Sequence, residues 1–201
     1  MEKDKSKQMV RSTGISKIKT AIFISGNGSN MKNLIKFSKL KTSPIYVDLV
    51  LSSNKKANGI RYLKKTKIVS KIFNFKNKKD EEKILKILKK RKINLICLAG
   101  FMRILYNDFI EKFNRNILNI HPSLLPKYKG LNTHERVIMS NEKFSGCTVH
   151  LVNSKLDSGK IILQKKVRIN KKDNPRTLSK KILKQEHVLY PKALKKFLSR
   201  T

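Results

Sequence analysis

The stretch that most restricts the fold is INLICLAGF, residues 93–101, the longest clean apolar run in the chain. Its length suits a buried strand and falls well short of the roughly 20 residues that cross a membrane. A continuous apolar run of this kind is typical of a strand covered on both faces, at the centre of a parallel sheet. The run therefore predicts an α/β fold.

The segments before this run alternate between strand and helix patterns. We predict strands at 22–25, 45–53 and 68–75, and helices at 30–40, 58–67 and 78–92. The last of these helices is the clearest, because acids lie in its first turn, bases lie in its last turn, and one face is apolar (Ile84, Leu85, Ile87 and Leu88). Strands that alternate with helices favour a doubly wound, mostly parallel sheet with helices on both faces.

The second half of the chain has a different pattern. We predict a strand at 115–120, a helix near 132–140, strands at 146–153 and 160–169, and a final helix from Pro175 to about Leu198. The turn SKLDSG (154–159) is short enough to join an antiparallel pair. Asn174 is a possible cap for the final helix, and Pro191 is expected to kink this helix or end its first part.

The length of 201 residues favours one domain over two. We expect this domain to cover residues 18–201, in two halves that meet near residue 117, after a disordered basic tail at 1–17. The N-terminal segment has no apolar core, so we do not expect a secretory signal. Cys97 and Cys147 lie in predicted strands without metal-ligand spacing, which is typical of reduced core residues in a cytoplasmic protein with no metal site.

The net charge of +35 comes from 48 Lys and Arg against 13 Asp and Glu. Such a charge suggests nucleic-acid binding. The basic residues are nevertheless spread through every segment, and aromatic residues make up only 7% of the chain, with no Trp. We therefore favour a general compositional bias, with no specific nucleic-acid or membrane partner, and expect the surface to attract small anionic substrates.

The sequence SGNGSN (25–30) connects a predicted strand to a helix. Gly26 and Gly28 permit a tight turn with free backbone N–H groups at a helix N-terminus, where a phosphate fits. The sequence is neither a Walker motif nor a full dinucleotide fingerprint, since Met31 replaces the third Gly. An ordinary strand-to-helix turn is the alternative, and we favour phosphate binding.

The segment NIHPSLLPKYKG (119–130) carries little charge for this chain. Alternation along the strand puts Asn119 and His121 on one face, near the carboxyl edge where open α/β sheets bind ligands. An imidazole beside an amide can stabilise an oxyanion that forms from a carbonyl. A buried structural histidine explains the pattern equally well.

Three other kinds of residue are ambiguous from local sequence. Asp157 lies in a turn, where aspartate is usually a turn former. His134 and His150 are weak signals alone, and His150 is expected to be structural. Glu186 falls on one helix face with Leu178, Ile182 and Leu189, where a carboxylate either binds something or points to solvent.

Taken together, these segments resemble the phosphoribosylglycinamide formyltransferase family. The resemblance covers about residues 19–197 and rests on ISGNGSN, LAGFMRIL, NIHPSLLPKYKGLNTH, GCTVHLVNSKLDSGKIILQ and QEH, in that order. THERV, together with GNGSN, narrows it to the glycinamide branch. It implies a Rossmann-like open twisted sheet, mostly parallel with an antiparallel part in the C-terminal half. It also implies a phosphate-binding half at 18–117 and a folate-binding, catalytic half at 118–201.

The resemblance implies a metal-free enzyme of purine biosynthesis that moves a formyl group from 10-formyltetrahydrofolate to the amine of glycinamide ribonucleotide, as a monomer or homodimer. The matching catalytic residues are Asn119, His121 and Asp157. The matching substrate-binding residues are Gly28, Ser29, Asn30, Leu183, Lys184, Gln185 and Glu186. The matching folate-binding residues are Met102, Arg103, Ile104, Leu105, Asn119, Asn153, Ser154, Lys155, Leu156 and Asp157. In this scheme Asp157 keeps His121 protonated.

Two segments depart from the family pattern. An Arg usual near the start of the helix at 78–92 is absent, and Asn77 or Lys78 takes its place on the folate side, without the bidentate geometry of Arg. The loop NSKLDSG is less acidic than usual, with Ser158 at a common Gly. Folate affinity or glutamate-tail preference is therefore expected to differ.

Three other functions fit parts of the pattern. A formyltransferase acting on initiator methionyl-tRNA shares the catalytic segment, but such proteins carry a further C-terminal domain. A formyl-folate hydrolase carries an additional N-terminal domain. A non-catalytic RNA-binding protein has no need to keep Asn119, His121 and Asp157 together.

Overall fold

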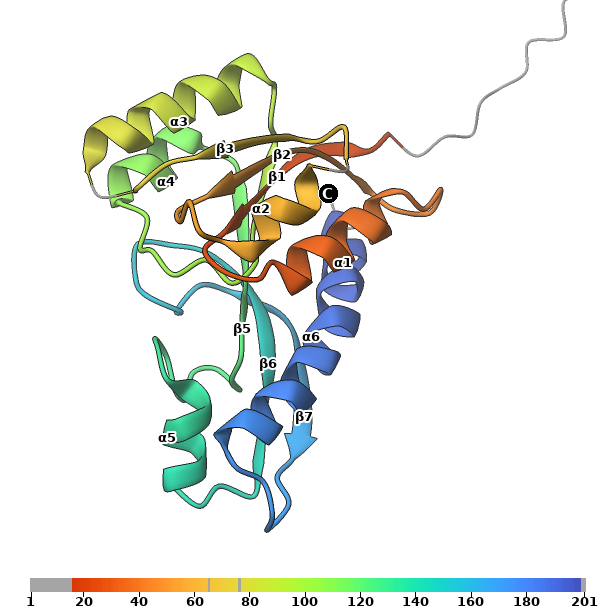
Figure 1. Ribbon diagram of the computed structural model, residues 1–201, viewed down its shortest axis with the longest axis vertical. Helices are drawn as coiled ribbons and strands as arrows, with labels where there is room; N and C mark the ends of the chain where they lie inside the picture. Colours follow the sequence, from red (N-terminus) through yellow and green to blue (C-terminus); the bar gives the residue numbers. More distant parts are fainter. Residues whose placement is uncertain (1–15, 65, 76, 200–201) are drawn as a thin grey trace, which may run out of the picture.

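In the computed structural model, which describes residues 16–64, 66–75 and 77–199, seven strands form one mixed sheet (Figure 1). Its order is β3-β2-β1-β4-β5-β6-β7. The strands are β1 (Ile18–Ile24), β2 (Ile45–Ser52), β3 (Val69–Ile72), β4 (Leu95–Leu98), β5 (Asn116–His121), β6 (Phe144–Leu151) and β7 (Ile161–Arg168). The first five are parallel, whereas β6 runs antiparallel to both β5 and β7. The predicted fold class is confirmed.

The helices within the described residues are α1 (Ser29–Ser38), α2 (Asn58–Leu63), α3 (Lys78–Lys90), α4 (Asn107–Phe113), α5 (Thr133–Met139) and α6 (Pro175–Leu198). Helix α2 ends four residues before its predicted end, and β1 begins four residues before its predicted start. Helix α4 was not predicted, because its seven residues are too few to show a clear helical period. The Asn174 cap of α6 is confirmed as a capping box with Thr177.

The central strands are buried on both faces because alternate residues point into two separate cores. In β4, Leu95 and Cys97 belong to the core under α1 and α6, whereas Ile96 and Leu98 belong to the core under α3 and α4. Helices therefore cover both faces of the parallel part (Figure 1). This is why residues 95–98 read as an unbroken apolar run.

Pro191 does not end α6, which continues through it to Leu198. A proline inside a helix leaves the carbonyl four residues earlier without its usual N–H donor, and here that residue is His187. Asn33 of α1 supplies the missing donor, with its Nδ2 2.6 Å from the His187 carbonyl oxygen. A side chain 154 residues away in sequence thus supplies the hydrogen-bond donor that α6 lacks at Pro191.

Asn33→Ala is expected to lower the free energy of unfolding by about 1–2 kcal/mol, because it leaves the His187 carbonyl without a partner. In a Pro191→Ala background the restored backbone N–H takes over, so the same substitution should cost clearly less. Urea unfolding of the four proteins in this cycle measures both losses. Equal losses in the two backgrounds would show that Asn33 does not act through this carbonyl.

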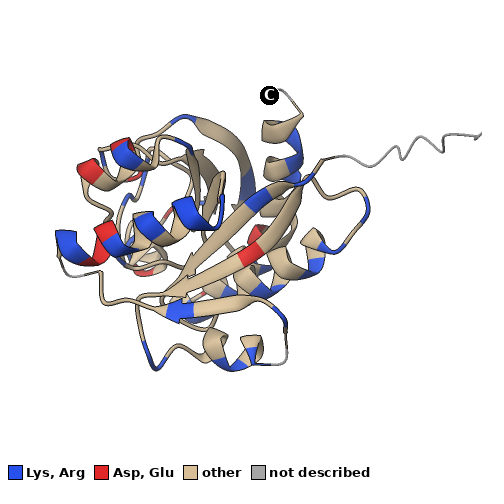
Figure 2. Ribbon diagram, turned by 90° about the horizontal axis from the view of Figure 1, so that it is seen from above, with Lys and Arg blue, Asp and Glu red and all other residues tan. Residues whose placement is uncertain are grey.

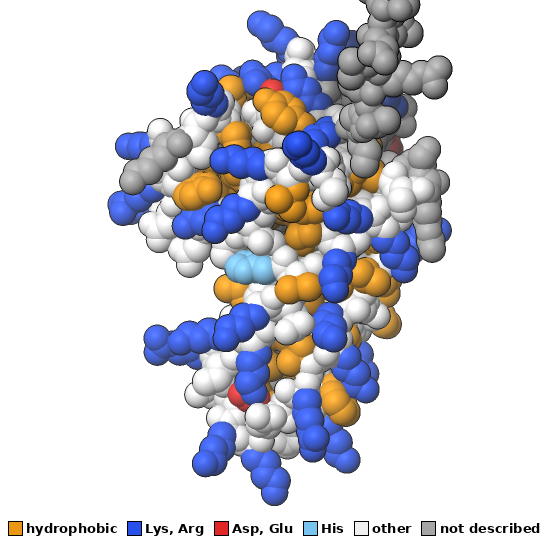
Figure 3. All heavy atoms as spheres, turned by 90° about the vertical axis from the view of Figure 1, so that its right-hand side faces the viewer, with side chains coloured by type: hydrophobic (Ala, Val, Ile, Leu, Met, Phe, Trp, Pro, Cys, Tyr) orange, Lys and Arg blue, Asp and Glu red, His pale blue; other side chains and the backbone are white. Residues whose placement is uncertain are grey.

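Lys and Arg lie on helices, strands and loops alike (Figure 2). On the face seen in Figure 3, basic side chains spread among apolar and neutral ones instead of gathering in one stripe. No helix among the described residues is long and apolar enough to cross a membrane. Of the predicted tail at 1–17, residues 1–15 lie outside the described residues, while Lys17 Nζ donates to the carbonyls of Ser38 and Leu40.

Candidate functional site

A cleft of about 1010 Å³ opens at the carboxyl ends of β1, β4 and β5. The chain runs from β1 outward to β2 and β3 and then returns to β4 on the other side of β1, so the strand order reverses between β1 and β4. Open α/β sheets bind ligands at such a reversal. The cleft therefore lies where the topology predicts a binding site.

The cleft collects almost all the side chains singled out in the sequence. Gly28, Ser29 and Asn30 line it, as do segments 102–105 and 153–157, together with Asn119, His121, Leu183 and Glu186. Three predicted residues are not among the lining residues: Lys78, Lys184 and Gln185. Lys184 is exposed on α6, and Lys78 Nζ pairs with Asp108 Oδ2 at 3.0 Å.

The turn at 25–28 brings a helix N-terminus to the cleft wall. Gly28 precedes α1 with φ of 67°, and the helix has no side-chain cap and no acid in its first turn. A Cβ on Gly28 would lie 3.0 Å from the Cα of Gly59, so both the backbone conformation and the close approach require glycine. The first N–H groups of α1 have no intrahelical partners, which suits an anion such as phosphate.

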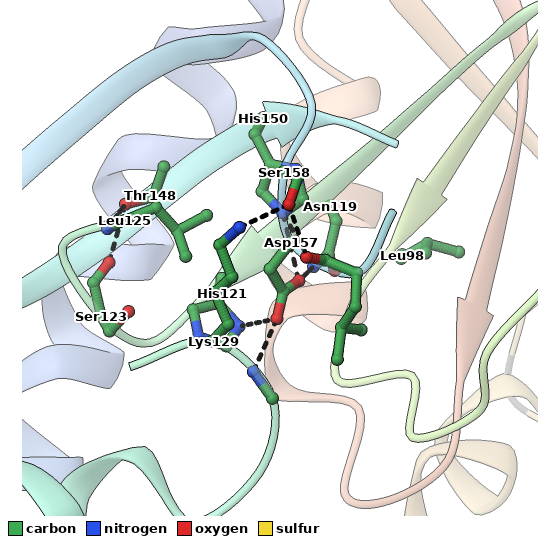
Figure 4. A network of polar contacts seen from close by, with 12 residues as sticks. Leu98, Asn119, His121, Ser123, Leu125, Lys129, Thr148, His150, Asp157 and Ser158 are labelled. Carbon is green, nitrogen blue, oxygen red and sulfur yellow. Dashed lines mark hydrogen bonds and ion pairs between the residues drawn. The ribbon is translucent and has the colours of Figure 1, made fainter. Parts of the chain in front are cut away.

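Asp157 joins the two polar side chains at the end of β5 (Figure 4). Its Oδ2 lies 3.2 Å from His121 Nδ1, and its Oδ1 lies 3.5 Å from Asn119 Nδ2. The backbone N–H of Gly130 also donates to Oδ2, at 2.9 Å. Asn119 and His121 therefore do share one face, and Asp157 is both a turn residue, with φ of 46°, and part of the cluster.

The protonation of this cluster follows from its burial. Burial lowers the pKa of His121 more than the Tyr128 carbonyl and the Asp157 carboxylate raise it. Burial raises the pKa of Asp157, but contacts with His150, Gly130 and His121 outweigh it and leave the pKa lowered. Burial therefore opposes the imidazolium expected from the resemblance, whereas the Asp157 carboxylate and the Tyr128 carbonyl favour it.

Both ring nitrogens of His121 nevertheless face acceptors. Nε2 lies 2.8 Å from the Tyr128 carbonyl oxygen, and Nδ1 faces Asp157. Since a carbonyl and a carboxylate both only accept, each favours a proton on the ring nitrogen that it faces. A proton gained during a reaction would be held between Nδ1 and the Asp157 carboxylate.

His150 belongs to the same cluster, although the sequence indicated only a structural role. Its Nε2 lies 3.2 Å from Asn119 Nδ2 and 3.5 Å from Asp157 Oδ1. The Leu151 carbonyl oxygen lies 2.8 Å from Nδ1, so the ring is held between this carbonyl and the side chains of Asn119 and Asp157. The feature that brings His150 to this cluster is the antiparallel register that pairs Asn119 with His150. The pattern of a single strand does not reveal such a register.

A buried hydrogen-bond network fixes the segment that follows β5. Thr148 Oγ1 donates to the Ser123 carbonyl at 2.7 Å and accepts from the backbone N–H of Leu125 at 3.2 Å (Figure 4). Gln164 Nε2 donates to Thr148 Oγ1 and to the Leu125 carbonyl. Neighbouring strands thus hold the loop that carries Tyr128 and Gly130 against the cluster of Asn119, His121 and Asp157.

Glu186 is buried, with 7% of its surface exposed, so a rotation of α6 that would point it to solvent is excluded. Asn30 Nδ2 donates to its Oε2 at 2.7 Å, and burial raises the pKa of Glu186 more than this bond lowers it. The other amide atom, Asn30 Oδ1, is buried with no hydrogen-bond partner among the described residues. This corner of the cleft offers acceptors to a ligand that carries N–H or O–H groups.

The opposite wall of the cleft is apolar and open. Met102 and Ile104 are 62% and 74% exposed, and the exposed Leu131 and Leu156 line the same cleft from two other segments. Arg103, Lys155 and Arg176 bring positive charge to the same cleft. An aromatic ligand with an anionic tail fits such a wall. Arg176 is a cleft residue that no sequence motif indicated.

The sequence profile of the formyl transferase family matches residues 18–194. The chain is 38% identical to phosphoribosylglycinamide formyltransferase of Haemophilus influenzae over 183 residues, which cover 89% of this chain and 86% of that protein. It is also 38% identical to the human trifunctional purine biosynthetic protein adenosine-3, over 92% of this chain. The chain spans about a fifth of the length of that trifunctional relative, at 19%.

Solved structures agree with these sequence matches. The fold superposes on phosphoribosylglycinamide formyltransferase of Brucella melitensis with a TM-score of 0.85 at 41% identity, covering 90% of this chain and 96% of that one. The enzyme of the same name from Bacillus halodurans gives a TM-score of 0.85 at 35% identity, with 90% and 95% coverage. The similarity therefore extends over nine-tenths of the chain.

Proposed function

Because the chain belongs to the formyl transferase family, we propose that it transfers the formyl group of 10-formyltetrahydrofolate to the amine of glycinamide ribonucleotide, a step of purine biosynthesis. The observation that carries the proposal is the cluster of Asn119, His121 and Asp157 at the carboxyl end of β5, in a cleft that a phosphate-type turn and an apolar wall also line. Similarity to proteins named for this activity supports it. The products are formylglycinamide ribonucleotide and tetrahydrofolate.

The two substrates occupy different parts of the cleft in this proposal. The ribonucleotide phosphate binds at the turn of Gly28, Ser29 and Asn30, and Glu186 accepts hydrogen bonds from the glycinamide end. The folate ring system lies against segment 102–105, and the loop at 153–157 covers it. A volume of about 1010 Å³ is at the upper end for a single small ligand, which suits two ligands in contact.

The reaction then needs an electrophile, an oxyanion site and a route for one proton. The neutral amine attacks the formyl carbon, a C–N bond forms, and the carbonyl oxygen becomes an oxyanion that Asn119 Nδ2 and protonated His121 stabilise. The proton that charges His121 comes from the attacking amine and is held beside Asp157. The same proton passes to N10 of the folate as the C–N bond between N10 and the formyl carbon breaks and the carbonyl re-forms. Most of the rate acceleration is expected from holding the two substrates together.

Tyr128 and Gly130 have supporting parts in this scheme. The Tyr128 carbonyl binds Nε2 of His121, so that Nδ1 stays turned toward Asp157. The N–H of Gly130 stabilises the Asp157 carboxylate. The Lys78–Asp108 pair leaves Lys78 outside the cleft wall, so in this proposal Arg103 and Lys155 receive the folate carboxylates instead.

A formyl-transfer assay tests the proposed function directly. Purified protein is mixed with 10-formyltetrahydrofolate and with glycinamide ribonucleotide, initiator methionyl-tRNA or no acceptor, and the products are followed. Turnover that requires the ribonucleotide supports the proposal. Release of formate in its absence would instead identify a hydrolase, and transfer only to methionyl-tRNA would identify the other branch of the family.

Glu186→Gln is expected to raise KM for glycinamide ribonucleotide about tenfold, since it removes the charged acceptor for the substrate amine. KM for the folate should stay within about twofold, because Glu186 lies outside the apolar wall. Steady-state kinetics with each substrate varied in turn separate the two. A larger change in the folate KM than in the ribonucleotide KM would place Glu186 in the wrong half of the site.

The remaining features of the proposal concern architecture and partners. Residues 18–117 supply the phosphate-binding half, and residues 118–201 supply most of the folate-binding and catalytic half. The partners are small molecules, and the spread of basic side chains in Figures 2 and 3 supports general attraction of anions over one nucleic-acid surface. A monomer or homodimer remains the prediction.

A further inference from the structure

Glu81 is a buried carboxylate that the proposed chemistry does not use. It lies in the first turn of α3, only 3% of its surface is exposed, and it does not line the cleft. An acid in a first helical turn normally stays in water, where it complements the helix dipole without losing its hydration. The burial of Glu81 therefore requires a specific partner.

That partner is the backbone of the segment that forms the folate-facing wall. Glu81 Oε1 accepts the N–H of Tyr106 at 3.1 Å, and Tyr106 directly follows the cleft-lining segment 102–105. Helices α3 and α4 lie over the same face of the sheet, and this bond joins the start of one to the residue before the other (Figure 1). Glu81 thus holds the C-terminal end of segment 102–105.

The other end of the same segment is held from β1. Ser25 N–H donates to the Gly100 carbonyl at 3.0 Å, and Met102 N–H donates to Ser25 Oγ at 2.7 Å. Between these two anchors Met102 and Ile104 are exposed, although Leu105 is buried in the core. The conformation of the wall consequently depends on two attachments, and Glu81 is one of them.

We propose that Glu81 is a positioning residue. Through the hydrogen bond that it accepts from the Tyr106 N–H, it fixes segment 102–105, which carries Met102 and Ile104 of the apolar wall. The role rests on the proposed function, since the wall matters only if a folate binds there. Glu81 touches no reacting group, so its effect falls on folate binding and spares both the binding of the ribonucleotide and the chemical step.

The surroundings of Glu81 make this attachment sensitive to pH. Burial raises the pKa of Glu81 to about 7, and the Tyr106 N–H lowers it less. The charged groups that face it are Lys78 on its own helix and Asp108 on α4, which pair with each other. The ionised carboxylate is the stronger acceptor, so the wall becomes better fixed as the pH rises through the pKa.

The test compares Glu81→Ala with Glu82→Ala, a matched control on the exposed side of the same helix turn. Hydrogen exchange over 101–106 and the dissociation constant for tetrahydrofolate should both rise about fivefold in Glu81→Ala, the equivalent of one hydrogen bond. The dissociation constant for glycinamide ribonucleotide should stay within about twofold, and Glu82→Ala should change none of the three.

Glu81→Gln keeps an acceptor oxygen and cannot ionise. Its dissociation constant for tetrahydrofolate should match that of the unmodified protein at about pH 6 and stay there at about pH 8, where the unmodified protein binds more tightly. Equal weakening of both substrates in Glu81→Ala, or no change in exchange, would overturn the inference. Failure of the unmodified protein to bind tetrahydrofolate would instead sink the proposed function, and hydrogen exchange would still decide whether Glu81 holds the segment.

Discussion

Replacement of His121 by alanine is expected to lower kcat by about 10³-fold, the largest effect of any single substitution in the cleft. His121 is 5% exposed, its imidazole lies against Asp157, and it is the proposed group that gains a proton and stabilises the oxyanion. Both KM values should change less than about threefold, because the phosphate turn and the apolar wall do not depend on the ring. Single-turnover formyl transfer measures the loss in the chemical step.

His187→Ala is the matched control, since His187 is a partly buried histidine on α6 that does not line the cleft. Its kcat should stay within about twofold of the unmodified protein. If His121→Ala retained more than about a tenth of the original kcat, the ring would not take part in proton transfer or oxyanion stabilisation.

Asp157→Asn is expected to lower kcat by about 10²–10³-fold, because an amide cannot hold the proton that His121 gains. The sign of its effect on His121 follows from the charges. The Asp157 carboxylate raises the pKa of His121 against the larger lowering by burial, so removing the carboxylate must lower that pKa further. An NMR titration of the imidazole should therefore move to lower pH in the variant.

Asp173→Asn supplies the comparison for this substitution. Asp173 pairs with Lys181 at 2.6 Å beside the start of α6 and is not among the cleft-lining residues. Its loss should leave kcat within about twofold. A titration of His121 that stays at the same pH in Asp157→Asn would show that the carboxylate does not control the imidazole, whatever happens to kcat.

Local sequence patterns predicted some residues of the candidate site and left others undecided. Alternation along β5 placed Asn119 and His121 on one face, and the glycine-containing turn SGNGSN (25–30) indicated a phosphate site that lies in the same cleft. Local patterns left Asp157 and Glu186 undecided, because a turn aspartate and a helix glutamate occur for other reasons. Their burial against His121 and Asn30 resolved both, and these contacts join residues 36 and 156 positions apart.

By itself, the sequence determined the alternation of strands and helices, the central position of β4 and the apolar faces of α3 and α6, since each depends on the period of neighbouring side chains. Only the tertiary structure decided that His150 faces Asn119, that Lys78 pairs with Asp108, that Asn33 supports α6 at Pro191, and that Glu81 holds Tyr106. Each of these is one hydrogen bond or ion pair between distant segments. Such contacts leave no periodic trace in the sequence, because they depend on how the helices pack and on the register of the strands.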